Sequence, residues 1–227
     1  MPADTVREII RLLIDAYGDR AWHSDHQPLA TLIQTILSQN TSDTNSRRAF
    51  RALRKAFPRW EDLAEADMND IAHAIRSGGL GEVKSIRIRQ ALQEIKQKRG
   101  NFDLSFLKEL PVSRARDWLM ELPGVGMKTA NCVLLFSLGM PALPVDTHIF
   151  RVAKRLRLID TRATIEQAHR QLADMVPPES VYQFHVLMIE HGRRTCKARR
   201  PLCPICILRG ICPSYAMFTK STDALQE

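Results

Sequence analysis

Residues 122–151 read LPGVGMKTANCVLLFSLGMPALPVDTHIFR. Gly124 and Gly126 predict a tight turn between two helices, because glycine adopts backbone conformations closed to other residues and lets another backbone come close. The free N–H groups at the start of the following helix would face outward as a phosphate site, with Val125 as the apolar plug that pins the turn. An ordinary helix–helix turn explains the same pattern, since Pro-Gly pairs are common turn formers.

Two residues of this stretch suggest chemistry. Lys128 falls in the first turn of the second helix, where the positive end of the helix dipole and partial burial both favour a neutral amine. Asp146 follows eighteen residues later and precedes the next helix, where the role of N-cap is the simpler interpretation. Taken together, an amine and a carboxylate suit Schiff-base chemistry, in which the carboxylate accepts a proton or stabilises positive charge on a sugar.

The composition favours a polyanionic partner. The 227 residues include 33 Lys and Arg against 25 Asp and Glu, a net charge of +8, so nucleic acid is the first partner to consider and a merely basic protein the alternative. His148 and Arg151 are then predicted to contact DNA or solvent rather than to catalyse. No apolar run reaches the ~20 residues of a membrane helix, and the N-terminal stretch lacks a signal peptide. We expect a cytoplasmic, nucleoid-associated protein.

Four of the five cysteines lie close together, as Cys196, Cys203, Cys206 and Cys212 with the spacing Cys-x6-Cys-x2-Cys-x5-Cys. Four thiolates on a short loop can hold one [4Fe–4S] cluster or one zinc ion. Zinc is the second choice because its sites usually pair two short Cys-x-x-Cys elements, and a disulfide is the third because the expected compartment is reducing. Cys132, in the apolar helix pattern, is predicted to be a small core residue.

The same region is strongly basic. Residues 191–222 contain seven Lys or Arg and no Asp or Glu. Part of this charge would compensate the thiolates. The rest, with Lys197, Arg199 and Arg200 between the first two cysteines, suits a surface that grips phosphates.

The remaining chain shows helical periodicity and no convincing alternation, so an all-α fold is predicted. Asp67 is expected to cap one of the helices. The expected helices cover residues 4–17, 28–38, 44–57, 60–66, 68–77, 82–99, two short helices in 104–121, the hairpin pair, 146–158, 164–175 and 178–192.

With these elements in place, the chain resembles DNA glycosylases of the helix-hairpin-helix superfamily, and endonuclease III in particular. The resemblance is carried by Leu-Ser-Gln-Asn-Thr-Ser-Asp at 37–43, Gly-Leu at 79–80 with Lys84-Ser85, the hairpin, Val-Asp-Thr-His-Ile-Phe-Arg-Val at 145–152, and His-Gly-Arg-Arg-Thr-Cys at 191–196 with the cysteine spacing. It runs through nearly the whole chain.

The resemblance implies two helical lobes with a DNA-binding cleft between them. One would be a six-helix barrel of residues 21–136 that contains the helix-hairpin-helix. The other would be a cluster lobe of residues 1–20 and 137–227, with a [4Fe–4S] cluster on the loop 196–212.

By the same resemblance, Lys128 would be the nucleophile and Asp146 the assisting carboxylate of a bifunctional DNA glycosylase/AP lyase. It would act in base excision repair as a monomer on double-stranded DNA that contains a damaged base, expected to be an oxidised pyrimidine, or an abasic site. The alternatives are the same chemistry on mismatched, deaminated or alkylated bases, and a non-catalytic iron–sulfur protein that binds DNA.

Two loops would touch the base pair under repair. Asn40, preceded by Gln39, occupies the position where endonuclease III usually has a Gln that fills the gap left by the flipped nucleotide. Leu80 matches a leucine that wedges into the duplex, although a leucine that anchors its loop to the core is the alternative. Lys84 is expected among the DNA contacts of the basic helix that follows.

Overall fold

The computed structural model describes residues 2–23 and 27–219. Every regular element in these ranges is a helix and none is a strand, as the sequence predicts. The chain forms two compact units, residues 23–140 and residues 1–22 with 141–227. We call them the hairpin unit and the cysteine unit. Their borders lie at residues 22/23 and 140/141, a few residues after the borders at 20/21 and 136/137 that the resemblance implies.

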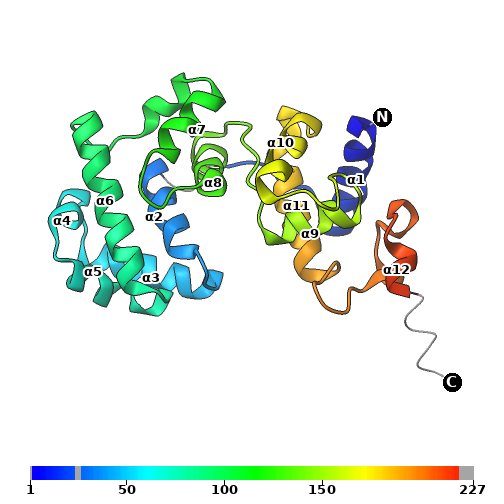
Figure 1. The fold of residues 1–227 in the computed structure, drawn as a ribbon, viewed down its shortest axis with the longest axis horizontal. Helices are drawn as coiled ribbons and strands as arrows, with labels where there is room; N and C mark the ends of the chain where they lie inside the picture. Colours follow the sequence, from blue (N-terminus) through cyan, green and yellow to red (C-terminus); the bar gives the residue numbers. More distant parts are fainter. Residues whose placement is uncertain (1, 24–26, 220–227) are drawn as a thin grey trace. The chain divides into compact units, whose positions relative to one another are not determined.

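The hairpin unit holds the helices from α2 to α8, drawn from blue to green in Figure 1. Their bounds are α2 Pro28–Ser38, α3 Asp43–Ala56, α4 Trp60–Glu65, α5 Met68–Ala74, η1 Arg76–Gly78, α6 Gly81–Arg99, η2 Ser105–Glu109, α7 Val112–Met120 and α8 Met127–Leu138, where η marks a 3-10 helix.

The cysteine unit combines the N-terminal helix with the last third of the chain (Figure 1). Its elements are α1 Pro2–Tyr17, α9 Thr147–Arg155, α10 Ile165–Met175, η3 Pro178–Ser180, α11 Val181–Arg194, η4 Cys203–Ile205, η5 Arg209–Ile211 and α12 Tyr215–Thr219. The sequence predicted only loop after residue 192, whereas the structure places short helical turns and α12 there.

Local side chains set several helix ends. Ser42 and Asp67 accept backbone N–H bonds at the starts of α3 and α5, the second as predicted. Thr164 and Gln167 form a reciprocal capping box at α10. Such caps satisfy N–H groups that have no partner within the helix.

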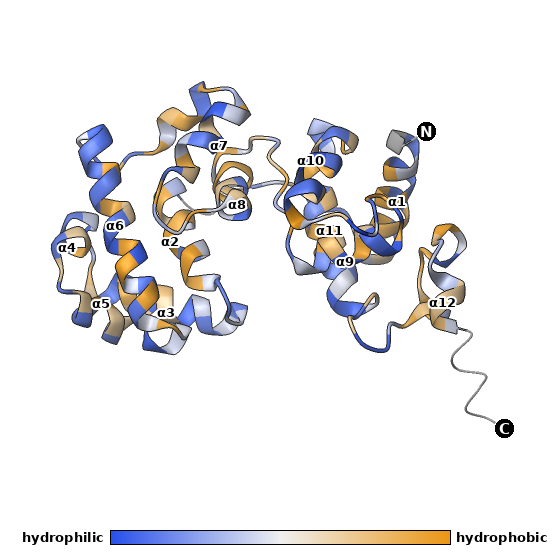
Figure 2. Cartoon of the chain, in the orientation of Figure 1, coloured by the Kyte–Doolittle hydropathy of each residue, from blue (hydrophilic) through white to orange (hydrophobic). Residues whose placement is uncertain are grey.

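The core of the hairpin unit lies between α2 and α8, which pack against each other. Figure 2 shows hydrophobic residues along α2, and Leu32, Ile33 and Ile36 are fully buried. The buried Ser137 of α8 donates its hydroxyl proton to Thr31 of α2 at 2.6 Å. This packing fixes the start of α8, and therefore Lys128, against the end of α2.

The cysteine unit is organised around α11, which packs against α1 and α9. Phe184, Leu187 and Met188 of α11 are fully buried, and Gly192 allows close approach, since a Cβ there would lie 3.0 Å from Cβ of His148. No helix among the described residues has the length and apolar character needed to cross a bilayer.

Candidate active site and nucleic-acid interface

The Pro-Gly-Val-Gly stretch forms a turn between α7 and α8. The Val125 N–H donates to the Leu122 carbonyl at 3.1 Å, and Gly124 has a φ of +76°. A Cβ at Gly124 would lie 2.6 Å from Cδ of Arg87, so both the backbone and the space require glycine. Val125 is buried, whereas Gly124 and Gly126 are exposed. The turn therefore presents backbone to the surface and anchors itself through one apolar side chain.

Lys128 is in the first turn of α8, directly after Gly126, the N-cap residue. Its side chain is partly exposed. Among the described residues it has no hydrogen-bond or ion-pair partner. A lysine amine that is not held by a carboxylate can react with an electrophile once it loses its proton.

Asp146 lies in the cysteine unit, at the start of α9. Its Oδ1 accepts the Ile149 N–H at 2.8 Å, which makes it the N-cap of that helix. No other described residue donates a hydrogen bond to the carboxylate. The cap holds one oxygen in place, and the other remains available to a ligand.

The segment that leads to Asp146 is held by two buried histidines. Nδ1 of His185 lies 2.9 Å from the Pro144 carbonyl and Nδ1 of His169 lies 3.3 Å from the Leu143 carbonyl. Val145 is fully buried beside them. These contacts fix the backbone on the N-terminal side of the carboxylate.

Gln39 and Asn40 follow α2 and have different positions. Gln39 donates through Nε2 to the Gly124 carbonyl at 3.1 Å and accepts from Arg87 at 2.8 Å. Asn40 is exposed with a φ of +54°, a left-handed conformation in which asparagine is enriched. Gln39 is thus part of the hairpin structure, and Asn40 is the amide that points into solvent.

Leu80 is the N-cap residue of α6 and combines two unfavourable features. Its φ of +52° costs a non-glycine residue about 1–2 kcal/mol, and its side chain is 56% exposed. Strain and exposed apolar surface at one residue point to a functional constraint. The alternative of a leucine that anchors its loop to the core does not fit this exposure.

Lys84 lies on α6 but differs from the surface contact expected from the sequence. The side chain is 1% exposed, and Nζ donates to the carbonyls of Leu37 at 2.7 Å and Gly78 at 2.9 Å. Burial lowers the pKa of the Lys84 amine. Lys84 therefore connects two loops from inside the hairpin unit and presents no charge to a ligand.

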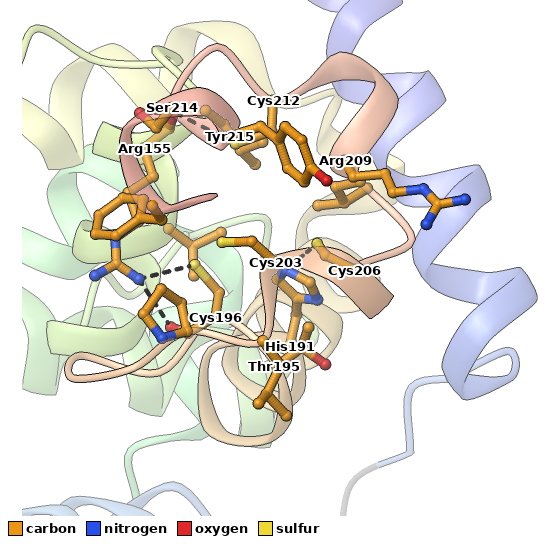
Figure 3. Close-up of a pocket in the computed structure, with 16 residues that line it drawn as sticks. Arg155, His191, Thr195, Cys196, Cys203, Cys206, Arg209, Cys212, Ser214 and Tyr215 are labelled. Carbon is orange, nitrogen blue, oxygen red and sulfur yellow. Dashed lines mark hydrogen bonds between the residues drawn. The ribbon is translucent and has the colours of Figure 1, made fainter. Parts of the chain in front are cut away.

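The four clustered cysteines line one pocket of the cysteine unit, together with residues of α9, α11 and α12. Figure 3 shows them around a common space beside Arg155 and His191. Burial, together with the charges of the neighbouring cysteines, raises the pKa of Cys206 to about 11. Burial likewise raises the pKa values of Cys203 and Cys212. A bound cationic centre would favour the thiolate forms of these three cysteines, because metal ligands must be deprotonated.

A single zinc ion and a [4Fe–4S] cluster require different arrangements of the four cysteine sulfurs. Among the described residues, no group of three or more His, Cys, Asp or Glu is placed so that it could hold a single metal ion. Zinc needs every sulfur about 2.3 Å from one ion, whereas each cysteine of a [4Fe–4S] cluster binds a different iron. The four cysteines that line one pocket supply the donor set that a [4Fe–4S] cluster requires.

Two arginines of α9 hold the first part of the cysteine loop. Arg151 donates to the carbonyls of Cys196 at 3.0 Å and Gly192 at 2.7 Å. Arg155 donates to Sγ of Cys196 at 3.2 Å and to the carbonyls of Lys197 and Ala198. Burial lowers the pKa of Arg151, and His148 lies 3.2 Å from its guanidinium. Arg151 and His148 thus take part in contacts within the cysteine unit while remaining partly exposed, whereas Lys197 is exposed.

Sequence reasoning missed Arg87 and Arg155 as structural residues. The chain has 33 Lys and Arg, so residue type alone does not distinguish these two arginines. The available signal was their spacing, since Arg87 is three residues after Lys84 and Arg155 four after Arg151. These intervals place each pair on one face of a helix.

Comparisons with known proteins place these features in a family. The model of the HhH-GPD superfamily base excision DNA repair proteins matches residues 33–178. Endonuclease III of Thermotoga maritima is 35% identical over 92% of this chain and 93% of its own length. A putative DNA glycosylase of Arabidopsis thaliana, At3g47830, is 37% identical over 71% of this chain, which covers 55% of that protein.

A solved structure of a trapped endonuclease III–DNA covalent intermediate, an estranged-adenine complex, has the same fold. Its TM-score is 0.82 with 30% sequence identity, and the match covers 95% of this chain and 97% of that one.

Proposed function

The chain belongs to the HhH-GPD superfamily of base excision DNA repair proteins, and we propose that it is a DNA glycosylase/AP lyase that works through a covalent bond between Lys128 and DNA. The observation that carries the proposal is the unpartnered amine of Lys128, two residues after the glycine turn that opens α8. A protein that only binds DNA has no need for a free amine at that position.

Lys128 would supply the nucleophile. In its neutral form, Nζ attacks C1′ of the damaged nucleoside, and the bond from C1′ to the base breaks with its electron pair on the departing base, which takes up a proton. Loss of a proton from Nζ and opening of the sugar ring give an imine between Lys128 and C1′. Removal of a C2′ proton then expels the 3′ phosphate, which cuts the strand, and water releases the lysine.

Asp146 would assist at two points. Its carboxylate can accept the proton that Nζ loses, and its negative charge can stabilise positive charge that develops on the sugar. The cap bond from Ile149 and the contacts that His169 and His185 make to the preceding segment hold the group in one orientation. Such preorganisation is what electrostatic stabilisation requires.

The DNA partner would be a duplex that contains a damaged base or an abasic site. Reaction at a base within a duplex requires the nucleotide to be rotated out of the stack. The exposed Asn40 and Leu80 would occupy the gap, while the N–H groups of Gly124 and Gly126 would bind a phosphate. The exposed Lys197 would contact the backbone. We propose that the enzyme acts as a monomer in the nucleoid.

We propose oxidised pyrimidines as the substrate class. Mismatched, deaminated or alkylated bases are a second candidate, because the exposed gap-filling amide is Asn40 and not the longer glutamine usual in endonuclease III. A shorter amide changes how the orphaned base is held, and therefore which opposite base is preferred.

Cys196, Cys203, Cys206 and Cys212 would hold a [4Fe–4S] cluster in the cysteine unit. The cluster would provide the positive charge that stabilises four thiolates and would thereby order the basic loop 196–212. The covalent chemistry assigned to Lys128 requires no electron transfer from it.

Borohydride reduction in the presence of duplex DNA with an abasic site tests the proposal. It should convert the imine to a stable protein–DNA adduct in the wild type. Lys128→Ala should form none, while Asp146→Asn should form it slowly. Lys108→Ala, which changes an exposed lysine of the same unit, serves as the control. No adduct with the wild type, or an undiminished adduct with Lys128→Ala, would contradict the assignment.

A further inference from the structure

Three loops of the hairpin unit carry the residues that the proposed function assigns to the gap and to the phosphate. The first follows α2 and contains Asn40, the second precedes α6 and contains Leu80, and the third is the turn at 122–126. The loops are far apart in sequence. Their positions relative to one another therefore depend on tertiary contacts. Two side chains of α6 make such contacts.

The first connection is Lys84. Its amine donates to Leu37 in the last turn of α2, three residues before Asn40, and to Gly78, two residues before Leu80. A single buried cation thus joins the backbones that lead into both exposed residues. No carboxylate of the described residues forms an ion pair with it, so it neutralises no charge. Burial of an unpaired charge is costly, which makes added stability a poor explanation for a lysine here.

The second connection is Arg87, one turn further along α6. Its guanidinium donates to Gln39 at 2.8 Å, and Gln39 donates to the Gly124 carbonyl at 3.1 Å. The side-chain carbons of Arg87 lie where a Cβ of Gly124 would be. Arg87 therefore joins the first loop to the hairpin turn, as Lys84 joins it to the second loop. Neither residue is among the groups that would touch DNA in the proposed function.

We infer that Lys84 and Arg87 are positioning residues, which hold the loops of Asn40, Leu80 and the hairpin turn in one arrangement before DNA binds, so that all three engage the duplex together. The inference rests on the proposed function, because it concerns how that function's gap-filling residues are placed. Its physical basis is that a displacement of about 1 Å in a positioned group can cost on the order of 100-fold in rate.

The test measures insertion into the duplex and needs no chemistry. A duplex is made with 2-aminopurine opposite a tetrahydrofuran abasic analogue, so that the fluorescence rises when Asn40 and Leu80 displace the orphaned base from the stack. Protein is added to saturation, and binding is followed separately by anisotropy. Lys84→Met keeps the length of the side chain and removes the amine. The Lys84→Met protein should still bind DNA through the hairpin. At saturation, the 2-aminopurine fluorescence of its complex should be lower than that of the wild-type complex and close to that of the Leu80→Ala complex.

Arg87→Ala provides a second variant, on a partly exposed residue, if Lys84→Met does not fold. It should also lower the saturating fluorescence. Lys96→Met is the matched control, since Lys96 is an exposed lysine of the same helix that pairs with Glu65, and it should match the wild type. Circular dichroism confirms that each variant retains its helices.

A purely structural role would lower the affinity or the folded fraction without changing the fluorescence of the saturated complex. Wild-type fluorescence at saturation in both Lys84→Met and Arg87→Ala would overturn the inference. That outcome is distinct from failure of the proposed function, which would appear as a wild type that forms no borohydride adduct.

Discussion

Helices α6 and α9 use basic side chains in the same way but toward different acceptors. Lys84 and Arg87 of α6 reach carbonyl and amide oxygens only. Arg151 and Arg155 of α9 reach carbonyls of the cysteine loop, and Arg155 also reaches Sγ of Cys196. The α6 residues therefore reach only protein groups in the loops that they hold, whereas the loop held by α9 carries the thiols that are the proposed cluster ligands.

This difference suggests how the two surfaces that would meet DNA are maintained. In the hairpin unit, every contact that holds the loops is made by the folded chain. In the cysteine unit, the exposed Lys197, Arg199 and Arg200 lie between two proposed cluster ligands. Loss of the cluster is expected to release the second surface and to leave the first in place.

Replacement of Cys203 by Ser tests whether the cysteine loop, unlike the loops of the hairpin unit, depends on the cluster. We expect it to have the largest effect of the variants considered. The variant should lack the brown colour of an iron–sulfur protein, and trypsin should cut rapidly after Lys197 and Arg199 because the loop is no longer held. Sites in the hairpin unit, such as Arg76 and Arg87, should stay as resistant as in the wild type.

Cys132→Ala is the matched control for that experiment, because Cys132 is a buried cysteine of α8. It should retain the colour and the protected loop. A colourless wild type with stoichiometric zinc would refute the cluster, and equal tryptic cleavage of both units in Cys203→Ser would remove the distinction between them.

Leu80→Gly separates function from stability in the loop that α6 holds. Glycine removes the exposed wedge and also relieves a strained backbone, so the free energy of unfolding should change by less than about 1 kcal/mol. Excision of thymine glycol from duplex DNA should slow by about tenfold or more, which corresponds to about 1.4 kcal/mol in the barrier. Single-turnover kinetics and chemical denaturation measure the two quantities. Unchanged excision would show that Leu80 is no wedge.

Asn40→Gln should have the smallest effect, because the contacts from α6 hold the backbone and leave only the length of the amide to change. Glutamine adopts the left-handed conformation less readily than asparagine, so the variant should lose up to about 1–2 kcal/mol of stability. We expect its relative excision rates opposite A, G, C and T to differ from those of the wild type by less than about tenfold. Identical preferences in the two proteins would assign the opposite base to another residue.

The sequence was sufficient for features that arise from local patterns. Asp67 caps α5 as predicted, Cys132 is buried, and the turn at 122–126 follows from its glycines. The all-α fold follows from periodicity, because apolar residues recur at helical spacing along the chain.

Lys84 and Arg151 could not be placed in the same way. A basic residue on a helix is usually a surface charge, and both were expected to contact DNA. Their acceptors are distant in sequence, 47 residues away for Leu37 and 45 for the Cys196 carbonyl. No local pattern records these contacts, because only the tertiary fold brings such a distant carbonyl to a cationic side chain on a helix.

The central claim is that Lys128 forms the covalent bond to DNA. Its most direct test is peptide mass spectrometry of the borohydride-reduced complex of the wild type with abasic duplex DNA. The account predicts the sugar remnant on Nζ of Lys128. A remnant on another amine, such as that of Lys84 or the N-terminus, or on none, would contradict it.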